Sequence, residues 1–173
     1  MEVTVVKATL NDEPTFRNLF QFYLYEFSRF MGWHVTYSGR YFEIDLDGCW
    51  TDDTRQPFLI RADQQLAGLA IVDRRAQSEL SGSADVRELS EFFVMAAVRR
   101  RGVGMRAAVS LFDRYPGRWE VRQLVRNADA LPFWRQVIGR YTSGRYTEMT
   151  FDDERWRGTA QFFDNTGFAR SNE

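Results

Sequence analysis

Hydrophobic and polar positions recur along this chain with two different periods, which together predict a mixed order of helices and strands. Alternating or β-branched apolar runs predict strands over residues 3–8, 58–62, 66–73, 86–95 and 119–125. Apolar residues at three- and four-residue spacing predict helices over residues 12–30, 105–115 and 127–139. Two last strands are predicted at 141–150 and 161–168, with an acidic turn at 152–154 between them.

The first predicted helix is strongly aromatic on one face. Asn11 or Asp12 can cap its start, and Pro14 suits its first turn. We expect most of this face to lie in the core; its apolar positions are Phe16, Leu19, Phe20, Tyr23, Leu24 and Phe27. After this helix we expect a short helix near 41–46 that Gly48 ends. A hairpin with its turn at 63–65 should follow.

Composition then narrows the class of protein. A chain of 173 residues, 44% of them hydrophobic, suits one globular domain over 1–173. A net charge of −1 gives no general attraction to nucleic acid. The single cysteine, Cys49, and single histidine, His34, exclude internal disulfides and cysteine or multi-histidine metal sites. Residues 1–7 do not resemble a signal peptide, and no apolar run approaches ~20 residues. We therefore expect a cytoplasmic protein with no metal and no membrane partner.

The most specific pattern is a basic stretch with two glycines between the strand at 86–95 and the helix at 105–115. Its sequence is Arg99-Arg100-Arg101-Gly102-Val103-Gly104. Glycines let a backbone curve closely around a ligand, and the following helix directs free N–H groups and its positive dipole end to the same point. These features suit a phosphorylated ligand. An ordinary turn with arginines in water is the competing interpretation.

This stretch resembles the GCN5-related N-acetyltransferase (GNAT) superfamily. Arg99, Gly102 and Gly104 match the family motif Arg/Gln-x-x-Gly-x-Gly/Ala. Val94 lies five residues before the arginine, where the family has an apolar residue. A dinucleotide-binding fold is the competitor for glycines after a strand, and we reject it because position 107 is alanine and not the third glycine.

A second match lies on the next strand. Asn127, followed three residues later by Ala130, corresponds to the asparagine at the end of that strand in the family. The stretch 92–134 also resembles a bacterial subfamily of predicted acetyltransferases. The resemblance implies an α/β (α+β) GNAT fold with a mixed sheet of six to seven strands and about four helices. Its two central parallel strands would splay apart after Val94.

The resemblance also implies that acetyl-CoA is the donor and lies between the splayed strands. Backbone N–H groups of 99–104 would hold its pyrophosphate, and the backbone of 93–95 would pair with its pantetheine arm. The N–H of Val94 would face the thioester carbonyl, as an oxyanion donor does. The implied cofactor-binding residues are Phe93, Val94, Met95, Arg99, Arg100, Arg101, Gly102, Val103, Gly104, Met105, Asn127 and Trp134.

Acetylation of an amine requires a base, because the amine must attack in its neutral form. Glu88 lies eleven residues before Arg99, an offset that matches the catalytic glutamate of histone-type members of the family. Glu91 lies eight residues before it, and strand alternation predicts that the two glutamates face opposite sides of the sheet. Only one would then face the cleft, and the sequence leaves open which one. Either could also be an ordinary strand carboxylate in a salt bridge.

The usual proton donor to the leaving thiolate is missing. Seven residues after Asn127 many family members carry tyrosine, whereas this chain has Trp134, whose indole N–H has no useful acidity. Tyr141 is the candidate replacement, with Tyr146 also near in sequence. Trp134 could equally be a core residue.

Acceptor specificity in such folds comes from the first two helices and the last strands. The candidates there are Tyr23, Glu26, Trp33 and Tyr41, which suit a cationic or aromatic amine, although core packing explains them too. We expect an acetyl-CoA-dependent N-acetyltransferase that acts on an amine, preferably a small molecule, by direct attack in a ternary complex. The alternatives are a protein N-acetyltransferase, a non-catalytic acyl-CoA-binding or sensor module, and a structural protein. Exposed last strands would allow a homodimer.

Overall fold

The order of helices and strands predicted from the sequence is confirmed by the computed structural model, which describes residues 1–168. The strands are β1 (Val3–Lys7), β2 (Arg55–Ala62), β3 (Gln65–Gln77), β4 (Ala84–Val94), β5 (Arg118–Leu124), β6 (Thr147–Asp152) and β7 (Arg157–Asp164). The α-helices are α1 (Glu13–Met31), α2 (Gly48–Thr51), α3 (Val103–Arg114) and α4 (Ala130–Tyr141). Two short 3-10 helices are η1 (Leu10–Asp12) and η2 (Ala96–Val98).

All seven strands form one mixed sheet in the order β1-β2-β3-β4-β5-β7-β6. Neighbouring strands are antiparallel except β4 and β5, which are parallel. Their pairing joins only Val86–Glu88 to Arg118–Glu120. The predicted splaying of two central parallel strands is thus confirmed, but it begins after Glu88 and not after Val94. A β-bulge in β4, described below, accounts for the early divergence because a bulge bends its strand and increases the twist.

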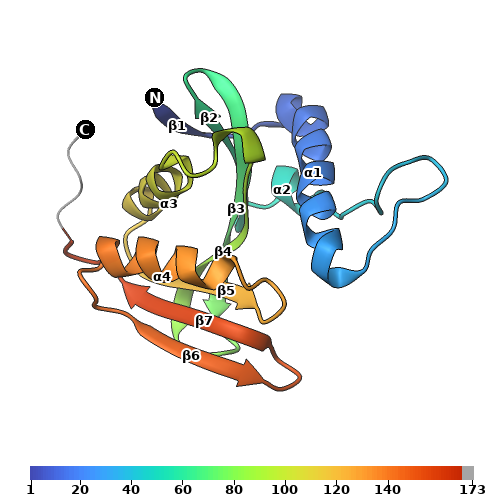
Figure 1. The fold of residues 1–173 in the computed structure, drawn as a ribbon. Helices are drawn as coiled ribbons and strands as arrows, with labels where there is room; N and C mark the ends of the chain where they lie inside the picture. The colour runs from blue at the N-terminus through green and yellow to red at the C-terminus, as the bar shows by residue number, and fades with distance from the viewer. Residues whose placement is uncertain (169–173) are drawn as a thin grey trace.

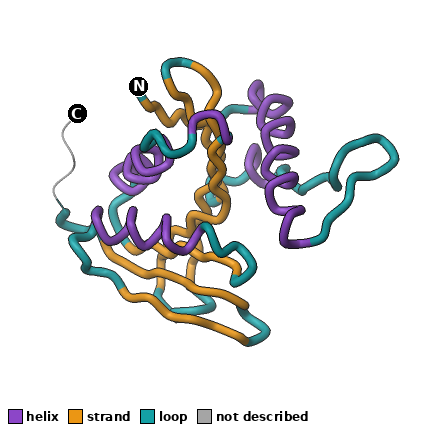
Figure 2. The backbone as a smooth tube through the Cα atoms, in the orientation of Figure 1, coloured by secondary structure: helices purple, strands orange, loops and turns teal. Residues whose placement is uncertain are grey.

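The helices form a layer on each face of the sheet (Figure 1). α1 and α2 lie on one side of the central strands, and α3 and α4 lie on the other. The aromatic face of α1 is buried against the sheet at Phe16, Leu19, Phe20 and Leu24, as expected. Figure 2 shows a long loop that leaves the end of α1 and returns toward α2, which precedes β2. None of the helices in residues 1–168 is both long enough and apolar enough to cross a membrane.

Two local predictions are wrong. Residues 41–46 form no helix, and the short helix lies instead at α2. The reason is that side chains of α1 use the backbone groups of this segment: the N–H of Tyr41 donates to Gln21 at 2.8 Å, and Arg17 donates to the carbonyl of Ile44 at 3.3 Å.

The last strands are also shifted. The predicted strand at 141–150 begins only at Thr147, because Tyr141 continues the helical spacing of Trp134 and Ile138 and remains in α4. β7 begins at Arg157, four residues before the predicted start. α4 itself begins at Ala130, the late start that Pro132 predicts.

Candidate functional site

A β-bulge in β4 decides how its two glutamates are oriented. Glu91 pairs with Ile71 of β3 and Glu88 pairs with Asp73, while Ser90 has no partner across the ladder. Ile71 and Asp73 are two residues apart on one strand and therefore share a face of the sheet. Glu88 and Glu91 must then share that face as well. The prediction that they point to opposite sides is wrong, because the extra residue shifts the alternation by one position.

Glu88 is enclosed by cations. It is buried, and its carboxylate contacts Arg75 at 3.0 Å and Arg122 at 3.3 Å. Burial raises the pKa of Glu88, while the two arginines act against this rise by favouring the carboxylate. With each oxygen held by a guanidinium, Glu88 has the surroundings of a structural ion pair.

Glu91 has a different environment. It is partly buried, and the hydroxyl of Tyr23 on α1 lies near its carboxylate. Burial raises the pKa of Glu91 to about 7, despite the opposing effects of Tyr23 and Arg55. Burial and the nearby carboxylate also raise the pKa of Tyr23 well above its usual value. A carboxyl that titrates near neutral pH can accept a proton there, as a general base must.

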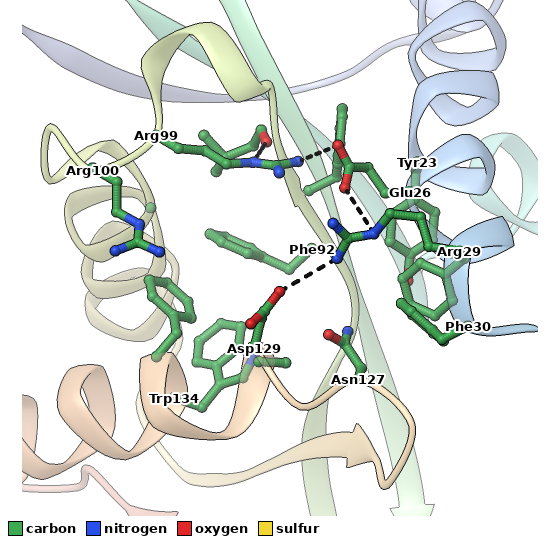
Figure 3. A pocket seen from close by; sticks show the side chains of 16 residues that line it. Tyr23, Glu26, Arg29, Phe30, Phe92, Arg99, Arg100, Asn127, Asp129 and Trp134 are labelled. Carbon is green, nitrogen blue, oxygen red and sulfur yellow. Dashed lines mark hydrogen bonds and ion pairs between the residues drawn. The ribbon is translucent and has the colours of Figure 1, made fainter.

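A cavity of about 310 Å³ opens beside this pair, between α1, β4, the start of α3 and the start of α4 (Figure 3). Nine of the predicted site residues line it: Tyr23, Glu26, Phe93, Val94, Arg99, Arg100, Gly104, Asn127 and Trp134. Seven others were not predicted as site residues: Phe27, Arg29, Phe30, Phe92, Asp129, Ala130 and Phe133. For Asp129 and Ala130, their closeness in the sequence to Asn127 could have indicated that they line the cavity. The end of α1 was missed because its aromatic spacing is equally typical of core.

The remaining predicted cofactor residues do not line this cavity. Met95 lines a separate groove beside α1, and Val103 is buried in the core. The cavity lining also lacks Arg101, Gly102 and Met105. Their position in the loop and first turn of α3 leaves the backbone as their means of contacting a ligand.

Two acceptor candidates are held elsewhere. Trp33 stacks on Phe27 with ring centroids 6.2 Å apart and meets Phe42 edge-on at 4.9 Å. The hydroxyl of Tyr41 contacts Ser28 at 3.1 Å. Neither Trp33 nor Tyr41 lines the cavity, so both stabilise the loop after α1 in this structure.

Tyr141 also lies away from the cavity. Its hydroxyl donates to Asp113 at 2.9 Å and accepts from the side-chain amide of Asn165 at 3.1 Å. Burial raises its pKa to about 12. Trp134, by contrast, forms part of the cavity wall and is nearly buried against Phe92 and Phe133, so it is both a lining and a core residue.

The basic loop has the backbone of an anion cradle. Gly102 precedes α3 in the left-handed conformation with φ 78°, and Arg100 has φ 62°. The first amides of α3 have no acceptor within the helix and point out of its N-terminus. Gly104 lies so close to the cavity wall that a Cβ there would be 3.1 Å from the ring of Phe133. The two glycines of this loop therefore have separate roles. Gly102 adopts the left-handed backbone conformation, and Gly104 allows close packing against Phe133.

The N–H of Val94 faces the space between the splayed strands. The next amide, that of Met95, donates to the carbonyl of Ala67 on β3 at 2.8 Å. Successive amides of a strand point to opposite sides, so the N–H of Val94 points away from β3. The carbonyl of Val94, on the same side, accepts from Nε of Arg99 at 2.6 Å.

A chain of ion pairs crosses the cavity. Arg99 contacts Glu26 at 3.2 Å, Glu26 contacts Arg29 at 4.0 Å, and Arg29 contacts Asp129 at 3.3 Å. Figure 3 shows these side chains linking the basic loop to α1 and α1 to the start of α4, while Arg100 extends alone. The lining of the cavity thus combines cationic side chains with aromatic rings.

No family model matches the sequence, and no curated protein matches it. Solved structures do match. The aminoglycoside acetyltransferase AAC(6')-Ib, crystallised with coenzyme A, is 14% identical, with a TM-score of 0.65 over 99% of this chain and 100% of that one. An acetyltransferase from Thermus thermophilus is 17% identical, with a TM-score of 0.64 over 95% and 97%. A GNAT-family acetyltransferase from Staphylococcus aureus is 11% identical, with a TM-score of 0.57 over 94% and 99%. At these identities the match concerns the fold alone, and this chain has the fold of the GNAT acetyltransferases.

Proposed function

We propose that this protein transfers an acetyl group from acetyl-CoA to an amine on a small molecule. The observation that carries the proposal is the cavity where β4 and β5 diverge, bordered by the N-terminus of α3. A phosphorylated, extended donor suits this site, because free helix amides and Arg100 lie at one end and the free strand edge of β4 leads inward. The crystal structure of the similar fold of AAC(6')-Ib in complex with coenzyme A supports the same choice of donor.

In this proposal the backbone does most of the donor binding. The amides at the start of α3 hold the pyrophosphate, with Arg100 beside them, and Asn127 contacts the pantetheine arm. The N–H of Val94 donates to the thioester oxygen. That hydrogen bond strengthens as negative charge develops on the oxygen in the transition state.

The reaction is a direct displacement. The neutral amine nitrogen forms a bond to the acetyl carbon, the carbon–sulfur bond breaks, and CoA leaves as a thiolate. Glu91 receives the proton that the amine loses, since its pKa of about 7 matches that task. Glu88 is not assigned this role, because its oxygens are already held by Arg75 and Arg122.

A small cationic or aromatic amine suits the acceptor side. Asp129 supplies an exposed carboxylate with one oxygen outside its ion pair, and Phe27 and Phe30 supply aromatic faces on the α1 side of the cavity. The AAC(6')-Ib structure is that of an aminoglycoside acetyltransferase, which supports a small molecule as the acceptor class.

The test is an assay of the full chain with acetyl-CoA and a panel of amines: sisomicin, spermidine, phenethylamine and peptides with free N-termini. Thiol release is followed with a chromogenic thiol reagent, and products are identified by mass. We expect turnover of at least one small amine and a loss of kcat of about 100-fold in Glu91→Gln. Glu88→Gln is the matched control and should retain kcat within about threefold.

Other outcomes would decide against the proposal. Acetylation of peptides alone would indicate a protein N-acetyltransferase. Acetyl-CoA binding without turnover across the panel would indicate a binding or sensor module.

A further inference from the structure

Arg99, the first arginine of the basic loop, is held at two points in the cavity. Its Nε donates to the carbonyl of Val94 at 2.6 Å, and its Nη2 lies 3.2 Å from the carboxylate of Glu26 on α1. Its guanidinium carbon also lies 5.6 Å from the centre of the Phe93 ring. All four residues line the cavity, so these contacts lie where a ligand would meet the end of β4.

The Val94 carbonyl belongs to the free edge of β4. Like the N–H of the same residue, it points away from β3 and toward the gap that opens after Glu88. An extended ligand that joins such an edge as an added strand must donate an N–H to one of its carbonyls. The pantetheine arm of acetyl-CoA has two amide groups with which it can do so.

Arg99 and such a ligand compete for one oxygen. The bond from Arg99 is short and its donor is charged, so it is stronger than a bond from a neutral amide. An oxygen bonded in this way is a weaker acceptor for a second N–H, and the guanidinium occupies space beside it. A ligand that pairs with Val94 must therefore displace or weaken the bond from Arg99.

Glu26 holds Arg99 at this oxygen. The side chain of Glu26 is 25% exposed and that of Arg99 is 38% exposed, so water screens the pair only in part. Glu26 also contacts Arg29 at 4.0 Å, and Arg29 contacts Asp129 at 3.3 Å (Figure 3). The pair is thus one end of a chain of ion pairs that reaches the start of α4, and this chain favours the position in which Arg99 meets Val94.

We propose that Glu26 is a positioning residue that keeps Arg99 on the free edge of β4 and thereby limits the affinity of the protein for its donor. When the donor binds, the Val94 oxygen exchanges the N–H of Arg99 for a pantetheine N–H. The guanidinium exchanges the Glu26 carboxylate for a phosphate group, while Glu26 keeps Arg29. The inference rests on the proposed function, because it takes acetyl-CoA to be the donor.

The test compares the Kd values of acetyl-CoA and S-acetylpantetheine, which has the same arm but no phosphate group and no net charge. Glu26→Gln loosens Arg99, so we expect the Kd of both compounds to fall about threefold, as for the loss of one partly exposed ion pair that opposes binding. Tryptophan fluorescence follows the titrations, since Trp134 lines the cavity. The neutral compound is needed because the removal of a negative charge would by itself favour only the anionic acetyl-CoA.

Glu13→Gln is the matched control. Glu13 lies on the same helix, forms an ion pair with Arg17 at 2.7 Å and is 27% exposed, but it does not line the cavity. Its Kd values should equal those of the unchanged protein. Thermal unfolding should show that both variants are folded.

Three outcomes would count against the inference. Unchanged or higher Kd values for both compounds in Glu26→Gln would overturn the role of Glu26 and leave the acetyltransferase proposal intact. A lower Kd for acetyl-CoA alone would indicate a general charge effect and would also overturn that role. An unchanged protein that binds neither compound would overturn both proposals.

Discussion

The ionised form of Glu91 destabilises the folded protein, and its proposed role as a base explains why such a residue is present. Its pKa rises from 4.5 to about 7 on folding, so the folded protein favours the neutral carboxyl. Such a group contributes stability that is fully present below its unfolded pKa and is lost as the pH rises through about 7. The folded state is therefore penalised at alkaline pH by an ionised, partly buried carboxylate.

Glu91→Gln should consequently stabilise the protein at pH 8.5. Glutamine has a similar shape and removes the charge, for a gain on the order of 3 kcal/mol, since one pKa unit corresponds to roughly 1.4 kcal/mol. The gain should shrink toward zero near pH 4.5. Chemical denaturation at both pH values measures it, and equal stability of the two proteins at pH 8.5 would contradict the raised pKa.

Gly102 offers a second test at the residue scale. Its φ of 78° lies in the left-handed region, which costs a residue with a Cβ about 1 kcal/mol. A Cβ there would lie 2.9 Å from the guanidinium end of Arg106, which can move aside. Gly102→Ala should therefore lower the free energy of unfolding by about 1 kcal/mol, measured in urea.

Gly139→Ala is the matched control for this substitution. Gly139 is helical, and its added Cβ would meet only the ring of Tyr146 at 3.8 Å. It should be neutral or slightly stabilising, because alanine is the better helix former. Equal effects at the two glycines would argue against backbone strain at Gly102.

At the scale of elements, β4 shows what a sequence pattern can and cannot reveal. Its position before the basic loop was predictable, because an apolar run precedes Arg99. The bulge at Ser90 was not, since one extra residue leaves no mark in a short run of mixed residues. That single residue places Glu91 on the same face as Glu88, whereas strand alternation predicts opposite faces. The position of Glu91 near Tyr23 was also hidden, because it depends on how α1 packs against the sheet.

The loop before α3 carries a prediction at this scale. Arg100 lines the cavity and extends alone toward it, so it is the arginine of this loop best placed for a phosphate group. Arg100→Ala should raise the Kd of CoA about tenfold and make binding less sensitive to salt. Calorimetry at two salt concentrations measures both effects.

Arg126→Ala provides the control, because Arg126 is an exposed arginine that does not line the cavity. Its Kd for CoA should match that of the unchanged protein. The same loss of affinity in both variants would indicate a general charge effect and not a phosphate contact at Arg100.

At the scale of the whole molecule, the order of elements determines where the cavity forms. The sheet is continuous from β1 to β6 and opens only where the parallel pair β4–β5 diverges, and each face is covered by its own helices. The order of elements was predictable from periodicity, and the opening between two parallel strands was implied by the resemblance at Arg99–Gly104 and Asn127. Self-association through exposed strands stays a prediction; β1 and β6 are the edges available for it.

Titration calorimetry of the full chain with acetyl-CoA tests the central claim most directly. The account predicts one binding site per chain with a Kd in the micromolar range, on the order of the KM values common for enzymes. Arg100→Ala should weaken this binding, while Glu91→Gln should leave it unchanged. The absence of binding at millimolar acetyl-CoA would contradict the account, because the cavity, the basic loop and Glu91 would then lack the donor on which their proposed chemistry depends.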